Sequence, residues 1–240
     1  MISPGPPRRG KVFKKTMDIG RAVKELLIRQ CRRPAGLLGE YVARRMNRSH
    51  LGLTTWGLSH VDVAKNDFLL DIGCGGGRTV ARLAAMAPEG LVCGIDVSAK
   101  SVAISRRASL RAIWEGRVAI RQASVSRLPY PNDTFRLATA VETHYFWPDM
   151  AADLREVLRV LRPGGRLLLI AEVYRCEKFD ARNREWLALT PMTYLGVDEF
   201  RSLFTAAGFT DIAIDEEPDE GWLCCVGRKP LPSGSPVAAG

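Results

Sequence analysis

The middle of the chain alternates between short apolar runs and longer segments whose apolar residues recur at helical spacing. Short runs bounded by glycine, proline or charge predict buried strands, and the longer segments predict helices that cover them. The expected strands are residues 68–71, 91–96, 118–122, 137–141 and 166–171, and the expected helices are 78–86, 100–114 and 151–161. Strands that alternate with helices in this way form a mostly parallel sheet with helices on both faces.

The end of the chain departs from this alternation. A helical pattern over residues 197–207 stops at Gly208, and two strand-like runs follow at 211–215 and 222–227. These runs are close enough in sequence to pair as a hairpin, which makes the last strand antiparallel. The predicted fold is therefore α/β: a doubly wound, Rossmann-like, seven-stranded sheet, mostly parallel, with an antiparallel last strand.

The residues before the first strand are helical in pattern. An amphipathic stretch over 17–31 ends before Pro34, and shorter helical stretches follow at 37–46 and 54–60. The closing residues have no periodicity. The expected organisation is a basic arm over 1–33, a helical segment over 34–66, one core domain over 67–229 and a disordered tail over 230–240.

The net charge of +9 belongs almost entirely to the arm. Residues 1–33 contain ten basic and two acidic side chains, so the rest of the chain is nearly neutral. Such an arm can make peripheral contact with a membrane, RNA or a protein partner, or it can be a solvated amphipathic helix, which is the more ordinary interpretation. Nucleic acid is therefore not the expected partner of the body.

Composition also bounds the compartment. No apolar run approaches the roughly 20 residues of a membrane span, and the first residues lack the apolar stretch of a secretory signal. The six cysteines show no C-x-x-C pair and no histidine at zinc-ligand spacing. We therefore expect a cytoplasmic protein that holds no metal.

The sharpest signal is a strand that runs into glycines and then into a helix. Gly73, Gly75 and Gly77 let the backbone turn tightly and let a flat ligand approach it. A dinucleotide fingerprint would need its third glycine at position 78, which is Arg78. The acidic Asp71 just before the glycines suits a cationic amino group better than a pyrophosphate, so a redox dinucleotide is the weaker hypothesis.

A second carboxylate follows at the end of the next strand. Asp96 lies about 20 residues beyond the glycines, where a carboxylate can accept both hydroxyls of a ribose. Alternatively, a carboxylate at a strand end merely caps the next helix. The spacing favours the ribose role.

These residues stand within a set of motifs that resembles the class I S-adenosylmethionine-dependent methyltransferases, especially the ubiquinone/menaquinone-biosynthesis branch. The resemblance covers residues 68–227 and rests on D-I-G-C-G-G-G at 71–77, G-I-D at 94–96, L-P-Y-P-N-D-T-F at 128–135 and E-V-L-R-V-L-R-P-G-G at 156–165. It implies S-adenosyl-L-methionine as cofactor and a small-molecule methyl acceptor as partner.

The resemblance also assigns positions around the cofactor. It implies that Asp71 and the glycines hold the methionine moiety, that Asp96 binds the ribose and that Val97 flanks the adenine. The remaining implied cofactor residues are Ser124, Val125 and Glu142. The family usually has an acidic residue at the position of Ser124, so the charge-assisted contact to the adenine amino group is lost here.

The methyl acceptor is expected beside the loop that follows the fourth strand. His144 is the candidate general base because its ordinary pKa is near neutral, and Tyr145 lies next to it. The alternative is that both only line the pocket, since an activated methyl group needs positioning more than a base. Trp56 and His60 in the preceding helical segment, a lid in related enzymes, and Tyr174 in a second candidate lid over 174–194 complete the expected acceptor residues.

Three functions remain in competition at this point. The leading hypothesis is methyl transfer to a small acceptor with release of S-adenosylhomocysteine. The others are an RNA or protein methyltransferase that uses the basic arm, and a non-catalytic subunit that only binds S-adenosylmethionine. The sequence lacks the N/D-P-P-Y/F motif of amino-methylating nucleic-acid enzymes after the fourth strand, which disfavours the second.

Overall fold

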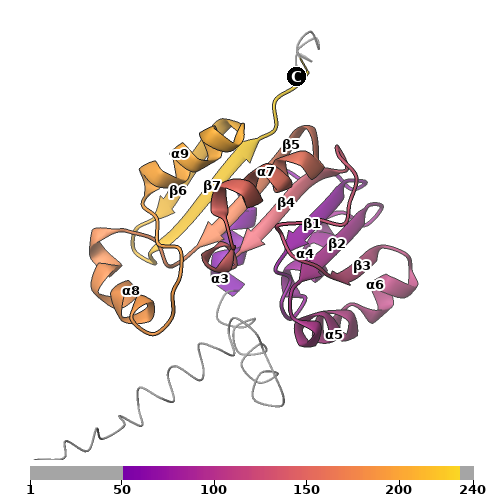
Figure 1. Ribbon diagram of the computed structural model, residues 1–240. Coiled ribbons are helices and arrows are strands. Elements are labelled where there is room, and N and C mark those ends of the chain that lie inside the picture. Colours follow the sequence, from indigo (N-terminus) through magenta and orange to yellow (C-terminus); the bar gives the residue numbers. More distant parts are fainter. Residues whose placement is uncertain (1–50, 233–240) are drawn as a thin grey trace, which may run out of the picture.

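A computed structural model describes residues 51–232 as one seven-stranded sheet with helices on both faces (Figure 1). The strands are β1 Phe68–Ile72, β2 Leu91–Asp96, β3 Val118–Gln122, β4 Phe135–Val141, β5 Leu161–Ala171, β6 Thr210–Glu217 and β7 Trp222–Arg228. The helices are α3 Leu51–Leu58, α4 Arg78–Met86, α5 Ala99–Ala108, α6 Leu110–Trp114, α7 Met150–Val160, α8 Asp180–Leu187 and α9 Val197–Ala207. Two short 3₁₀ helices, His144–Phe146 and Glu177–Phe179, complete the described elements.

The strand order explains where a ligand can bind. The sheet runs β3-β2-β1-β4-β5-β7-β6, and all pairs from β3 to β5 are parallel. β7 is antiparallel to both of its neighbours, so the predicted hairpin and the predicted antiparallel last strand are confirmed. The order reverses between β1 and β4, and open α/β sheets bind ligands at the carboxyl ends of strands beside such a reversal.

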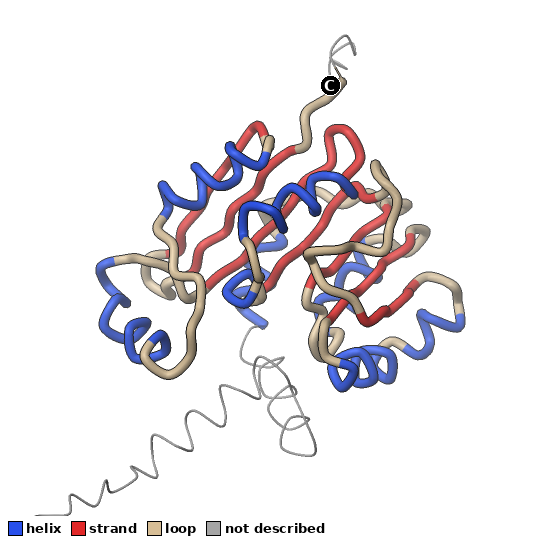
Figure 2. The backbone as a smooth tube through the Cα atoms, viewed as in Figure 1, coloured by secondary structure: helices blue, strands red, loops and turns tan. Residues whose placement is uncertain are grey.

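Two apolar cores sandwich the sheet. One core holds side chains from α7 and α9, and the other holds side chains from α3, α4, α5 and α6. Figure 2 shows the strands as one twisted layer with helices in front of it and behind it. The strands alternate large aliphatic residues toward the two cores, as a sheet buried on both faces requires.

The structure corrects several expected elements, among them the helical stretch 54–60, which is α3 Leu51–Leu58. The expected helix over 100–114 is two helices, because the chain breaks at Ser109, whose φ of −107° and ψ of 12° are not helical. β5 begins at Leu161 rather than 166, because the R-P-G-G segment continues the strand past a register shift instead of turning. The stretch between β5 and α9 contains α8, which the sequence did not predict since its apolar residues lack a helical period.

Helix α3 packs on the sheet itself. A Cβ at Gly57 would lie 2.2 Å from Cδ1 of Ile170, so the helix backbone sits directly on β5. The rest of the expected helical segment before position 51, the basic arm and the tail from 233 lie outside the described residues. Within the described part of the chain, no helix is long and apolar enough to cross a membrane.

Candidate functional site

The glycine turn joins β1 to α4 at the carboxyl edge of the sheet. The φ angles at Gly73, Gly75 and Gly77 are 75°, 49° and 82°, a left-handed conformation that residues with a Cβ rarely adopt. A Cβ at Gly73 would lie 2.3 Å from Oγ1 of Thr143, whereas a Cβ at Gly75 would meet nothing closer than 3.9 Å. The fold therefore requires glycine at position 73, and Gly75 leaves its backbone open to a ligand.

Asp71 is the penultimate residue of β1, just before this turn, and is 2% exposed. Its Oδ1 accepts a hydrogen bond of 2.7 Å from the hydroxyl of Thr139 on β4. Burial raises the pKa of the Asp71 carboxyl to about 7, the Thr139 hydrogen bond opposes that rise, and the nearby Asp96 adds to it. A buried carboxyl with this pKa is well suited to pair with a cation.

Asp96 stands at the end of β2 and reaches the glycine turn. Its Oδ2 accepts from the N–H of Gly75 at 2.9 Å, and its Oδ1 accepts from the N–H of Ser98 at 2.8 Å. Burial raises the pKa of Asp96, and these two N–H groups partly offset the rise. Ser98, not Asp96, is the N-cap of α5, because its hydroxyl accepts from the N–H of Ser101. The Ser101 side chain is a third donor to this carboxylate. Because the two oxygens together offer about four acceptor sites, one site stays open to a further donor.

The residues after β2 and β3 differ in exposure. Val97 is exposed beside Asp96. Ser124 accepts a hydrogen bond from the N–H of Ser126 at 3.2 Å and forms a bridge with Arg127, so its hydroxyl braces its own loop. Val125 is buried in the core on the α7 and α9 side.

The loop after β4 is held by a carboxylate and a phenol. Oε1 of Glu142 accepts 2.6 Å hydrogen bonds from the Tyr145 hydroxyl and from the N–H of Glu172. The Tyr145 oxygen also accepts from the N–H of Val173, and burial raises the pKa of Tyr145 well above its ordinary value. Together these contacts fasten the ends of β4 and β5 to each other at the same edge as the glycine turn.

His144 lies in the core beneath this loop. The side chain is fully buried, its ring centroid lies 4.0 Å from that of Tyr145 with the ring planes tilted by 46°, and neither ring nitrogen has a partner among the described residues. Burial lowers the pKa of His144 to about 3. The structure thus places the candidate general base away from solvent, with no hydrogen-bond partner for either ring nitrogen in the described part of the chain.

The other expected acceptor residues make structural contacts. Trp56 packs against Trp222 of β7 with ring centroids 5.9 Å apart, and His60 lies edge-on to Trp56. Nε2 of His60 is 4.0 Å from a carboxylate oxygen of Asp215. Tyr174 is buried in the core of α7 and α9. None of the contacts described for Trp56, His60 and Tyr174 involves the glycine turn.

Two residues of the site were not foreseen. Thr139 binds Asp71, and Thr143 packs against Gly73. A signal for Thr139 was present, because it is the polar residue in the otherwise apolar run 137–141. Its partner could not be read from the sequence, since the pairing of Asp71 with Thr139 depends on the register of β1 and β4.

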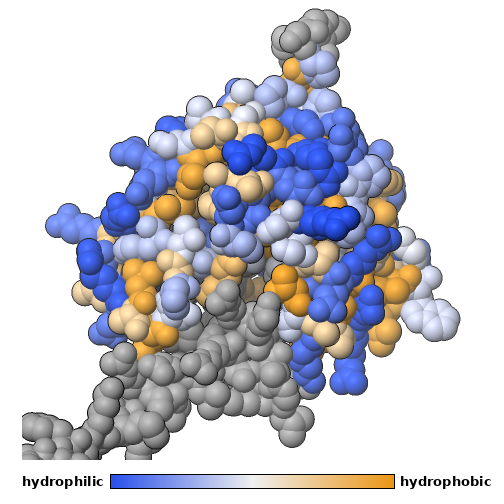
Figure 3. All heavy atoms as spheres, viewed as in Figure 1, coloured by the Kyte–Doolittle hydropathy of each residue, from blue (hydrophilic) through white to orange (hydrophobic). Residues whose placement is uncertain are grey.

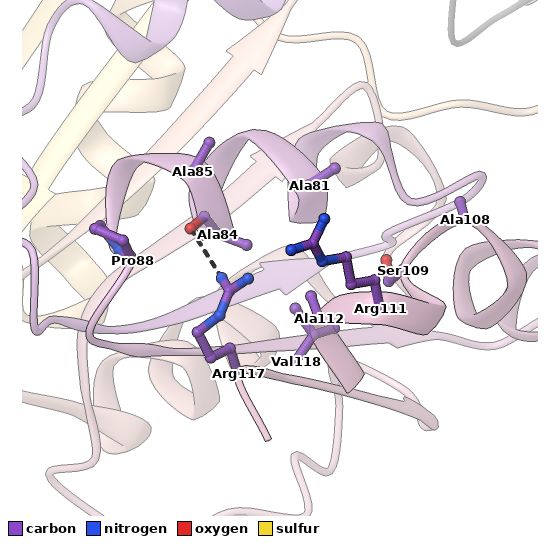
Figure 4. A pocket seen from close by; sticks show the side chains of 10 residues that line it. All are labelled: Ala81, Ala84, Ala85, Pro88, Ala108, Ser109, Arg111, Ala112, Arg117 and Val118. Atoms are coloured by element: carbon purple, nitrogen blue, oxygen red, sulfur yellow. Dashed lines mark hydrogen bonds between the residues drawn. The ribbon is translucent and has the colours of Figure 1, made fainter. Parts of the chain in front are cut away.

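A separate cavity of about 530 Å³ lies between α4, α6 and the start of β3 (Figure 4). Its walls are mainly alanine methyl groups, with Arg111 and Arg117 at the rim. It contains none of the expected site residues. Among the described residues, no group of three histidine, cysteine, aspartate or glutamate side chains is arranged to hold a metal ion, and the expectation of a metal-free protein remains a prediction.

Comparison with known proteins adds family information to this geometry. Residues 69–165 match the model of a methyltransferase domain. The chain is 41% identical over 103 residues to a 27-O-demethylrifamycin SV methyltransferase of Amycolatopsis mediterranei, covering 43% of this chain and 38% of the relative. It is 30% identical over 105 residues to a demethylmenaquinone methyltransferase of Symbiobacterium thermophilum, covering 43% and 42% of the two chains. The matched part therefore spans less than half of each of these relatives.

Solved structures share the fold. A chain from the complex of the Haloferax volcanii Trm112 methyltransferase activator with a methyltransferase superposes with a TM-score of 0.68 at 21% identity, covering 78% of this chain and 93% of that one. Haemonchus contortus phosphoethanolamine N-methyltransferase 2, solved with S-adenosyl-L-methionine, gives 0.65 at 15% identity, covering 75% and 53%. At these identities the likeness is one of fold.

Proposed function

The chain carries a methyltransferase domain of the class I, S-adenosylmethionine-dependent kind, and from this premise we propose that it transfers a methyl group from S-adenosylmethionine to a small-molecule acceptor. The observation that carries the proposal is the crevice at the reversal of strand order. There, Asp71, the open backbone at Gly75 and Asp96 meet at one edge of the sheet.

The residues fit the cofactor in shape and charge. A side chain at Gly75 would occupy the space that a ligand must enter, and this chain leaves that space clear. Asp71 supplies a buried carboxyl for the methionyl ammonium, and Asp96 supplies an acceptor site for a ribose hydroxyl. Val97 offers an exposed apolar surface for the adenine.

The proposed mechanism relies on positioning. When bound, S-adenosylmethionine supplies a methyl group on a positively charged sulfur, which is already activated for transfer. Asp71 would hold the methionyl end of the cofactor and Asp96 its ribose, and the hydrogen bond between Glu142 and Tyr145 holds the loop at the same edge. Alignment of two bound reactants can lower a barrier by about 7–11 kcal/mol, so the reaction does not depend on the buried His144.

The acceptor is proposed to be small and largely apolar or aromatic. Relatives of this chain are named for a demethylrifamycin and for demethylmenaquinone. The segment between β5 and α9 adds support, because apolar residues gather on the visible face around α8 (Figure 3) and Trp186 on that helix is 44% exposed. Such a surface can pack against an apolar acceptor at the end of the sheet.

The test is transfer of labelled methyl groups from S-adenosylmethionine to a panel of hydroxylated quinones, phenols and polyketides. The proposal expects S-adenosylhomocysteine to form together with one class of methylated product. Asp96→Asn keeps the side-chain shape but replaces one acceptor oxygen by a donor, so binding of S-adenosylhomocysteine should weaken at least tenfold. Failure of the wild-type protein to bind S-adenosylhomocysteine would reject the proposal, whatever the acceptor.

A further inference from the structure

Asp71 and Thr139 form a hydrogen-bonded pair between two central strands of the sheet. The two residues are direct register partners on the parallel strands β1 and β4, at the point where strand order reverses. Thr139 is fully buried and Asp71 almost so. Their hydrogen bond of 2.7 Å therefore lies in a low-dielectric interior, where its effect on a carboxylate is strong.

The surroundings of Asp71 are unfavourable to its charge. Asp96 from β2 and Cys74 from the glycine turn are the titratable groups that face it, and neither supplies a positive charge. No ion pair within residues 51–232 includes Asp71. The Thr139 hydroxyl is thus the side-chain donor that favours the ionised form, against burial that favours the neutral form.

The hydroxyl can serve both protonation states. Oγ1 of Thr139 is 2.7 Å from Oδ1 of Asp71 and 3.4 Å from the carbonyl oxygen of Leu70. It donates its single hydrogen to the Asp71 carboxylate. When Asp71 is protonated, the acid can donate to Oγ1, and the hydroxyl hydrogen can turn toward Leu70.

Building on the proposed function, we propose that Thr139 is a positioning residue for the cofactor: its hydroxyl aims the Asp71 carboxylate at the methionyl ammonium and favours the ionised form that binds it. Cofactor binding then releases a proton from those Asp71 side chains that are still protonated. The O–H bond of the Asp71 acid breaks, and its proton passes to water. The carboxylate then pairs with the ammonium group, which keeps its own protons. No oxidation or reduction accompanies the step.

The experiment is calorimetric titration with S-adenosylhomocysteine, which carries the same amino-acid group, between pH 5.5 and 8. Because the pKa of Asp71 is about 7, the wild-type dissociation constant should fall almost tenfold from pH 5.5 to 6.5 and level off near pH 8. Titrations at pH 7 in two buffers of different ionisation enthalpy should report release of about half a proton.

Three variants separate positioning from packing. Thr139→Val keeps the shape but removes the donor, which should raise the pKa of Asp71 by about one unit. Affinity should then fall about fivefold at pH 7 but less than twofold at pH 8. Thr139→Ser keeps a hydroxyl and should keep the wild-type profile, and Asp71→Asn should bind weakly at every pH without releasing a proton.

The outcomes are distinguishable. Wild-type protein that binds S-adenosylhomocysteine with no pH dependence and no proton release would overturn this inference and leave the proposed function intact. An unchanged profile in Thr139→Val would do the same. If Thr139→Val does not fold, the wild-type proton count and the Asp71→Asn profile still decide. Absence of binding in the wild type at every pH would instead reject the proposed function.

Discussion

Single glycines in the turn have separable tasks. Gly73 is tight against Thr143, whereas Gly75 faces open space. Gly75→Ala should cost about 1 kcal/mol through its positive φ and should abolish S-adenosylhomocysteine binding by filling the ligand's space. Gly73→Ala adds a clash and should cost about 3 kcal/mol. Urea unfolding and calorimetry measure both quantities, and normal binding by Gly75→Ala would contradict the assigned approach of the ligand.

Two buried groups should give the ligand-free protein opposing responses to acid. The pKa of His144 is about 3 in the folded protein against an ordinary 6.5, so acid favours the unfolded chain below pH 6.5. The pKa of Asp71 is about 7 against 3.8, so acid favours the folded chain below pH 7. Between pH 6.5 and 3.8 the two contributions nearly cancel.

Removing one of these two groups should reveal the effect of the other on the pH dependence of stability. His144→Phe keeps an aromatic ring, removes two unpartnered nitrogens and should stabilise the protein by about 1–3 kcal/mol at pH 7. Between pH 7 and pH 5, the free energy of unfolding of this variant should increase by about 2 kcal/mol more than that of the wild type. Over the same pH interval, the free energy of unfolding of Asp71→Asn should fall by a similar amount relative to that of the wild type. Urea unfolding at each pH measures these free energies. The same change in free energy of unfolding between pH 7 and pH 5 in all three proteins would contradict these assignments.

At the scale of elements, the buried side chain of α8 ties this helix to the segment that follows β5. Nδ2 of Asn183 donates to the carbonyl oxygen of Tyr174 at 2.9 Å, and Asn183 is fully buried. Asn183→Ala leaves that carbonyl unsatisfied, which should cost about 1–3 kcal/mol. Hydrogen exchange over residues 177–196 should accelerate while S-adenosylhomocysteine affinity stays within twofold, since the glycine turn is untouched.

Arg184 provides the control on the same helix. Its side chain is 70% exposed in an ion pair with Asp180, and exposed pairs contribute little to stability. Arg184→Ala should therefore leave the exchange pattern almost unchanged. Equal acceleration in both variants would mean that Asn183 is not the anchor.

Some of the helices and strands could be predicted from the sequence and others could not. Strands β2 and β3 and helices α4 and α9 were predicted with their observed bounds, because their apolar periodicity was undisturbed. Helix α8 was missed because tertiary anchors such as Asn183 hold it rather than an apolar stripe. The proposed cofactor residues Asp71 and Asp96 could be selected from local spacing, whereas the contact of Thr139 depends on strand register, which a single sequence does not reveal.

At the scale of the whole molecule, one architectural feature organises the proposed site. The reversal of strand order between β1 and β4 brings the glycine turn, Asp71 and the Glu142 loop to the same edge of the sheet. The apolar cores on the two faces fix that edge rigidly. The central claim is therefore that this edge holds S-adenosylmethionine, and not a redox dinucleotide.

Thermal unfolding with S-adenosylhomocysteine, and separately with NAD, tests that claim most directly. A ligand at a hundred times its dissociation constant adds about 2.7 kcal/mol, which raises the midpoint of a protein of this size by roughly 5–11 °C. We expect the unfolding midpoint to rise by this amount with S-adenosylhomocysteine and to stay unchanged with NAD. A rise with NAD alone, or no rise with S-adenosylhomocysteine, would contradict it.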